Sequence, residues 1–151
     1  MRIHPLSEGS FTVASSKVFV PFQKEQGNIN DRAKGSILVE IQPFVVITEK
    51  DIILLDTGLG QFTQTGILQV HHNLMNLGIN PSQITKVFLS HLHKDHASAI
   101  SYVHPDHQER FISFPYANYY VQRREFEFAM EGNKSSYLPE SIEMLRDYSK
   151  T

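Results

Sequence analysis

Cysteine is absent from the 151 residues of this chain. Disulfide bridges and thiolate metal ligands are therefore excluded, and any metal site has to be built from histidine and carboxylate side chains. An excess of charge of one sign is also missing, since 14 Lys and Arg residues against 16 Asp and Glu residues give a formal net charge of −2. This balance provides no electrostatic attraction to nucleic acids or anionic membranes, so neither is expected as a partner.

Long apolar segments are missing as well. No apolar run approaches the roughly 18 residues that a membrane span requires, and residues 1–5 lack the apolar core of a signal peptide. A cytoplasmic location is therefore predicted. The hydrophobic content of 40% and charged content of 20% are typical of a folded globular protein. The length allows one ordinary domain.

A cluster of imidazoles is the most informative feature that is present. The segment His91–His96 reads His-Leu-His-Lys-Asp-His and follows the apolar run 87–89. A strand that ends there would send His91 and His93 to the same side, because side chains alternate along a strand. A helix that begins near Asp95 would direct this carboxylate and His96 toward a second position, separate from the one that His91 and His93 face. Since imidazole and carboxylate are the usual ligands of zinc and similar ions, the spacing predicts two ligands for each of two neighbouring metal positions.

Simpler interpretations exist for each of these histidines. Those of the motif could be scattered polar residues, with Asp95 serving as a helix N-cap, although a cap can also be a ligand. His104 and His107 also have ligand-like spacing, but the proline between them favours an exposed turn. His71 and His72 fall within a helical pattern, which favours surface positions for both.

Hydrophobic periodicity predicts an α/β protein in which strands and helices follow one another. Strands are predicted at residues 36–47, 52–55, 87–90, 110–114 and 118–122. Helices are predicted at residues 67–77, 97–103, 125–130 and 139–148. Gly78 is well placed to end the first of these helices, and Pro43 indicates a bulge or an edge position within the first strand region.

The chain resembles the metallo-β-lactamase superfamily, whose signature is His-x-His-x-Asp-His after a buried strand. Residues 52–60 resemble the earlier strand of that family, which ends in Asp-Thr-Gly, and residues 79–84 resemble its short connector. Residues 6–11 resemble the opening of members of the lactonase-like branch. The resemblance implies an α/β fold of the αββα sandwich type, of which residues 1–151 would supply the N-terminal portion, the first sheet with its helices. Because family members have further ligands downstream and no Gly-His turn follows Glu131, the second half is expected to be missing from a truncated chain.

The resemblance also implies a chemistry. His91, His93, Asp95 and His96 would bind one or two divalent ions, with zinc as the expected cofactor. Asp56 would orient the ligand loop without touching metal, although its carboxylate could equally fix the turn at the end of a strand. In this family a metal-bound hydroxide attacks the substrate, and the lactonase-like opening favours a small ester or lactone. Asp95 would also orient the nucleophile or accept a proton, which makes it the candidate catalytic residue.

The competing interpretation is a half-domain that binds metal without catalysis or serves as a self-assembling module. Residues 44–47, 52–55 and 87–89 are almost continuously apolar, which predicts strands buried on both faces. Helices within the chain can cover one of these faces. An uncovered second face predicts self-association of the chain, as a homodimer or a larger assembly. The incomplete ligand set separately predicts weak or undetectable hydrolysis by the chain alone, because the nucleophilic water would be poorly positioned.

Overall fold

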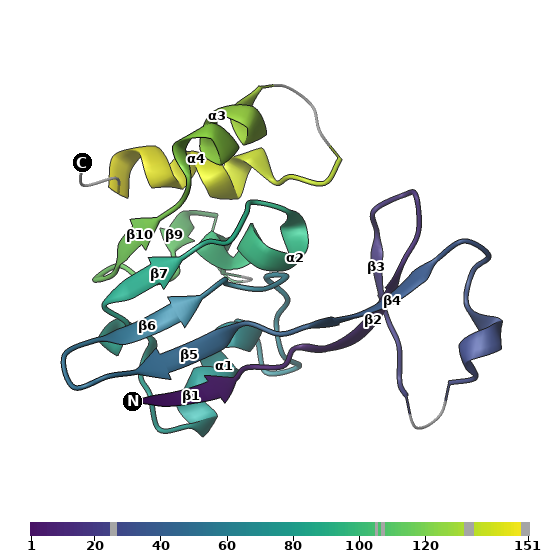
Figure 1. Ribbon diagram of the computed structural model, residues 1–151, viewed down its shortest axis with the longest axis horizontal. Helices are drawn as coiled ribbons and strands as arrows, with labels where there is room; N and C mark the ends of the chain where they lie inside the picture. The colour runs from purple at the N-terminus through teal and green to yellow at the C-terminus, as the bar shows by residue number, and fades with distance from the viewer. Residues whose placement is uncertain (25–26, 105, 107, 132–134, 149–151) are drawn as a thin grey trace.

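A mixed five-stranded sheet forms the centre of the computed structural model, which describes residues 1–24, 27–104, 106, 108–131 and 135–148 (Figure 1). In the order β1, β5, β6, β7 and β10, its strands span Arg2–Pro5, Phe44–Ile47, Ile52–Leu55, Lys86–Phe88 and Asn118–Tyr120. Strands β1, β5 and β6 are antiparallel neighbours, whereas β6, β7 and β10 run parallel. The carboxyl ends of β6 and β7 therefore lie at the same edge of the sheet.

Alternation of side chains along the strands gives this sheet two different faces. Val45, Leu54 and Val87 are fully buried and belong to the main hydrophobic core. Their sequence neighbours point the other way, and Leu55 and Phe88 keep 38% and 41% of their surface exposed. The apolar runs in these strands thus do not have both faces buried among the described residues.

Helices cover the buried face. Helix α1, Gln69–Asn76, places Val70 and Leu74 four residues apart on one side, and both are fully buried in the core. Gly78 follows with a φ of +76°, which suits the left-handed end of a helix and agrees with the predicted stop. Two further helices, α3 and α4, span Arg123–Met130 and Pro139–Tyr148. Both lie beyond β10 in Figure 1, and α4 contacts that strand.

Three antiparallel strands form an arm that projects sideways from the central sheet (Figure 1). In the order β3, β2 and β4 they span Phe19–Pro21, Gly9–Val13 and Ile37–Ile41. The predicted single strand region 36–47 is therefore two strands in two sheets, β4 and β5. Pro43 lies in the break between them, where its carbonyl accepts a hydrogen bond of 2.8 Å from the Leu6 amide. The predictions did not include β1, β2 or β3.

The predicted helix 97–103 is wrong in its position and extent. Helix α2 spans Lys94–Ala97, a 3-10 turn η3 spans Ser98–Ile100, and the chain then forms strand β8, Ser101–Val103. This strand pairs with β9, Arg110–Ile112, in a two-stranded sheet, so cross-strand pairing overrides the local helical pattern. Two more 3-10 turns, η1 and η2, span Ile29–Asp31 and Pro81–Gln83.

None of the helices in the described part of the chain has the length and apolar character needed to cross a membrane. The cytoplasmic location remains a prediction.

Candidate metal centre

The predicted metal motif spans the loop that joins β7 to α2 and the first turn of α2 itself. Strand β7 ends at Phe88, three residues before His91, and His93 is the N-cap of α2. The ring centroids of His91 and His93 lie 4.7 Å apart, and those of His91 and His96 lie 4.0 Å apart. The fold therefore brings all three imidazoles of the motif together at the carboxyl edge of the sheet, with His91 between the other two.

His96 is held between two carboxylates. Its Nδ1 lies 2.8 Å from Oδ2 of Asp56, and its Nε2 lies 3.4 Å from Oδ2 of Asp95. The hydrogen bond to Asp56, supported by Asp95, raises the pKa of His96 to about 9 in spite of partial burial. In the absence of a bound ion, His96 is thus a cation at neutral pH.

The pKa values of the two carboxyl groups, Asp95 and Asp56, are lowered, whereas that of His96 is raised. Burial alone would raise the pKa of Asp95, but its interaction with His96 outweighs this effect and holds the pKa below the ordinary value. For Asp56, burial is likewise outweighed by hydrogen bonds from His96 and from Ser90, so the pKa of Asp56 is also lowered. Both side chains are therefore ionised at neutral pH.

His91 has a different protonation state from His96. Burial, followed by the charges of the neighbouring histidines, lowers the pKa of His91. Its Nδ1 lies 3.1 Å from Oγ of Ser90. A neutral imidazole is the form that binds metal, so this ring is ready to act as a ligand.

Asp56 connects the end of β6 to the motif loop. Its carboxylate accepts hydrogen bonds of 2.7 Å from the Ser90 amide and 2.8 Å from the Ser90 hydroxyl, in addition to its contact with His96. The residue has a φ of +60°, a conformation that Asp and Asn tolerate better than most residues do. The next residue, Thr57, donates its amide to the His96 carbonyl at 2.7 Å. Both interpretations of Asp56 are therefore compatible: it forms the turn, and it orients a motif histidine.

Three residues that contact the motif were not predicted. Oε1 of Glu125, in the first turn of α3, accepts a hydrogen bond of 2.9 Å from the Leu92 amide. The ring of Tyr137 lies 4.9 Å from that of His93, and the Ser136 carbonyl accepts from the Lys94 amide at 2.9 Å. Nothing local in the sequence identifies these contacts, because they are made between segments about 33 residues or more apart.

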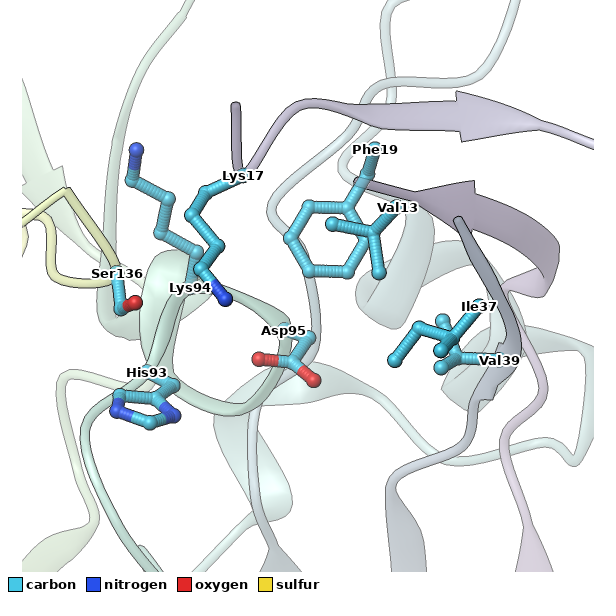
Figure 2. A pocket seen from close by; sticks show the side chains of 9 residues that line it. All are labelled: Val13, Lys17, Phe19, Ile37, Val39, His93, Lys94, Asp95 and Ser136. Carbon is cyan, nitrogen blue, oxygen red and sulfur yellow. The ribbon is translucent and has the colours of Figure 1, made fainter. Parts of the chain in front are cut away.

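A pocket of about 200 Å³ opens beside the motif (Figure 2). His93, Lys94 and Asp95 line one side, together with Ser136. The apolar side chains on the opposite side come from the arm, and they are Val13, Phe19, Ile37 and Val39. Lys17, from the turn between β2 and β3, completes the lining.

The donor set fits a zinc-type ion in its chemistry, because it consists of clustered imidazoles and a carboxylate. In geometry it is incomplete: the described residues include no group of three or more His, Asp or Glu side chains arranged to hold a metal ion. Part of the reason is visible at His96, where both ring nitrogens face carboxylate oxygens. The assignment of His91, His93, Asp95 and His96 as ligands remains a prediction.

The other histidines differ from one another. The surface position predicted for His71 is wrong: this ring packs 5.2 Å from that of Phe114 and contacts the Ser113 carbonyl at 3.0 Å. Burial lowers the pKa of His71 as a result. Nδ1 of His104 lies 3.7 Å from a carboxylate oxygen of Asp106, and His107 lies outside the described residues.

Comparison with known proteins assigns the family. Residues 39–136, about two thirds of the chain, match the model of the metallo-β-lactamase superfamily. The chain belongs to this superfamily. The matched segment contains Asp56 and the whole histidine motif, which supports the predicted fold and family. No curated protein matches the chain.

Solved structures of similar fold include metal-dependent hydrolases. A probable metal-dependent hydrolase from Staphylococcus aureus has 22% identity and a TM-score of 0.68, with 93% of this chain covering 54% of that one. AidC, a dizinc quorum-quenching lactonase, has 25% identity and a TM-score of 0.60, with coverage of 87% and 45%. The hydrolase AbOPH has 23% identity and a TM-score of 0.61, with coverage of 97% and 52%. The chain thus has the mixed α/β fold of this superfamily and spans about half the length of these structures.

Proposed function

We propose that this chain is the metal-binding part of a metal-dependent hydrolase that acts on a small ester or lactone. The single observation that carries the proposal is the convergence of His91, His93 and His96 beside Asp95 at the carboxyl edge of the sheet. Membership of a superfamily of hydrolases supports the reaction class. The lactonase-like opening of the sequence, and similarity in fold to a dizinc lactonase, favour the ester or lactone substrate.

In this proposal each predicted ligand of the motif binds one of two metal ions. His91 and His93 would hold one divalent ion, and Asp95 and His96 would hold a second, with zinc as the expected metal. A bound ion of this type supplies Lewis acidity, which activates water and polarises a carbonyl group. Asp95 is ionised and lines the pocket, so it can orient a water molecule or accept its proton. Asp56 fixes the orientation of His96 through the 2.8 Å contact with Nδ1.

The alternative is a half-domain that binds metal but does not catalyse. It is favoured by two specific observations: no three-ligand group exists within the described residues, and the chain covers only 45–54% of the three solved structures named above. Three protein ligands usually hold a catalytic zinc ion, so two per ion would leave the activated water poorly positioned. In either case we propose that residues 1–151 form one portion of a larger metallo-β-lactamase-like domain.

Metal content and hydrolysis measured on the same samples test the proposal. The chain is loaded with zinc, dialysed and analysed by mass spectrometry, and is then assayed with aryl esters and lactones. We expect zinc binding, and weak hydrolysis that depends on zinc, and we expect both to be lost in the double variant His91→Ala and His93→Ala. His72→Ala is the matched histidine control, because His72 lies in α1 outside the motif. Zinc retained by the double variant would contradict the ligand assignment, and zinc binding without any turnover would favour the non-catalytic alternative.

A further inference from the structure

The apolar face of the arm forms one wall of the pocket beside His93 and Asp95 (Figure 2). Val13 of β2 pairs in register with Phe19 of β3 on one side and with Ile37 of β4 on the other. Val39 lies two residues beyond Ile37 and therefore points to the same face. Four apolar side chains from three strands are thus directed at the pocket, and Ile37 still has 60% of its surface exposed.

Two lysines border the same pocket. Lys17 lies in the turn after β2 with a φ of +57°, an unusual conformation for a residue with a Cβ atom. Its amide donates a hydrogen bond of 3.0 Å to the Ala14 carbonyl, which closes the turn. Lys94 is the first residue of α2. Within the described residues, neither ammonium group forms an ion pair or a side-chain hydrogen bond. The carboxylate among the lining residues belongs to Asp95, which interacts with His96.

These features together indicate what the pocket can bind. Burial of an alkyl group against the apolar wall would stabilise a bound ligand. An anionic group on the same ligand would be attracted by the two unpaired ammonium groups. The volume of about 200 Å³ is below the roughly 300–1,000 Å³ of pockets for drug-sized ligands, so the alkyl group has to be short.

We propose that this pocket selects substrates that carry a short alkyl group and an anionic group. The alkyl group lies against Val13, Phe19, Ile37 and Val39, and the anion lies between Lys17 and Lys94. This inference rests on the proposed function, because it assigns the pocket beside the metal motif to the substrate. Within the class of small esters and lactones, it favours those that bear a carboxylate or phosphate over neutral ones. Lysine binds either anion as a point charge, so the shared feature is the negative charge.

The test measures binding alone, in metal-free buffer with a chelator, by NMR titration of the labelled chain. The probes are hexanoate, hexyl phosphate and the neutral hexanol. We expect the resonances of pocket residues to shift with both anions, at lower ligand concentration than with hexanol. The difference should shrink as salt is added, since Lys17 is exposed and Lys94 is only partly buried. Replacing hexanoate by butanoate should weaken binding by about fourfold for each methylene removed.

Two variants test the lysines separately. Lys17→Gly removes the ammonium and keeps the turn, because glycine adopts positive φ without strain. Lys94→Gln removes the charge from α2 and keeps a residue that favours a helix. Each should weaken hexanoate binding by up to about fivefold, the upper limit for an exposed ion pair, and should leave hexanol binding unchanged. Lys34→Gln is the matched control, because Lys34 is exposed and does not line the pocket.

The outcomes separate this inference from the proposed function. Hexanol binding as tight as that of the better-binding anion, or binding of that anion unchanged in Lys17→Gly and Lys94→Gln, would overturn the anion assignment even if the chain hydrolyses esters. Selective hexanoate binding without any zinc-dependent turnover would support the pocket assignment and would favour the non-catalytic alternative over the proposed hydrolase. If hexyl phosphate alone binds, the substrate anion is a phosphate, and if hexanoate alone binds, it is a carboxylate. Either result supports the inference.

Discussion

Asp56 and His96 are 40 residues apart in the sequence, yet Oδ2 of Asp56 lies 2.8 Å from Nδ1 of His96. The same carboxylate accepts two hydrogen bonds from Ser90. One side chain at the end of β6 therefore fixes both the start of the motif loop and the orientation of a motif histidine in α2. This arrangement explains how a short loop and the helix turn that follows it can hold three imidazoles close together.

Asp56→Asn tests this relationship without disturbing the turn. Asparagine tolerates the positive φ of Asp56, so the variant removes the negative charge and preserves the backbone conformation. We expect the free energy of unfolding to fall by about 1.5–3 kcal/mol, the usual range for hydrogen bonds to charged groups. Urea denaturation measures this loss. Asp31→Asn, in the exposed turn η1, is the control and should change stability by less than about 0.5 kcal/mol. An equal loss in both variants would show that the Asp56 network contributes nothing specific.

The buried carboxyl group of Glu8 should make the stability of the fold depend on pH. Its Oε2 accepts a hydrogen bond of 2.8 Å from the Leu59 amide, whereas its buried Oε1 has no hydrogen-bond partner in the described structure. Burial, only partly opposed by the bond from Leu59, raises the pKa of Glu8 from 4.5 to about 7. The folded state therefore binds the proton more tightly than the unfolded state does. This contribution to stability is complete below pH 4.5, declines as the pH rises and is lost above about pH 7.

Glu8→Gln should remove this decline. The amide keeps an acceptor for Leu59 and stays neutral at every pH, so the variant should be more stable than the parent by up to about 3 kcal/mol near pH 8. The advantage should disappear at about pH 3, well below both pKa values, where Glu8 of the parent is protonated in both the folded and the unfolded state. Urea denaturation at both pH values measures the difference, and Glu49→Gln, at an exposed position, is the control. A constant difference between parent and variant across this range would contradict the assignment.

Glu125 should support the motif from outside it. Its carboxylate accepts a hydrogen bond from the amide of Leu92, whose side chain is fully buried. Glu125→Ala leaves that donor without its partner, which should cost about 1–3 kcal/mol in the free energy of unfolding. It should also weaken zinc binding, because the loop between His91 and His93 loses an anchor. Glu127→Ala, an exposed position on the same helix, is the matched control for both measurements. Unchanged stability and zinc affinity in Glu125→Ala would mean that the loop is fixed by its other contacts.

The parts of the fold that were predicted correctly depend on short-range signals. The helical spacing of Val70 and Leu74, with Gly78 after them, was sufficient to predict α1, and a proline at the first position marked α4. The motif segment itself was found because its spacing is local. Its immediate surroundings were only partly predictable. Asp56 was identified through its place at the end of an apolar strand and through family resemblance.

The parts that were not predicted depend on pairing between distant segments. Gly9–Val13 forms a strand because it pairs with Ile37–Ile41, some 28 residues away, and its sequence alone alternates only weakly. Ser101–Val103 follows a helical turn, and its local sequence predicts that the helix continues, but the segment pairs with Arg110–Ile112. The support from Glu125 was missed for a similar reason: a glutamate in the first turn of a helix is normally explained by the helix itself.

One face of the central sheet carries exposed apolar side chains, which predict that the chain self-associates. Phe44, Leu55, Phe88 and Tyr120 occupy one row across four neighbouring strands, each directly paired with the next. Each keeps 36–41% of its surface exposed, and the rings of Phe88 and Tyr120 are stacked at 4.6 Å. No described residue covers this row.

We propose that a second copy of the chain covers this face. The row presents on the order of 300 Å² of apolar surface, so two copies would bury about 600 Å² of it, and flanking residues would add to this area. Stable interfaces bury roughly 1,200–2,000 Å² in total, so we expect a weak dimer that dissociates on dilution.

Sedimentation velocity over a range of concentrations measures this equilibrium. Leu55→Lys should shift it to the monomer, because it places a charge on the face in each copy, where the two would have to be buried together. Val20→Lys, on the exposed side of the arm, is the control and should leave the dimer intact. A parent chain that stays monomeric at every concentration would contradict the proposal, and so would a dimer that survives Leu55→Lys.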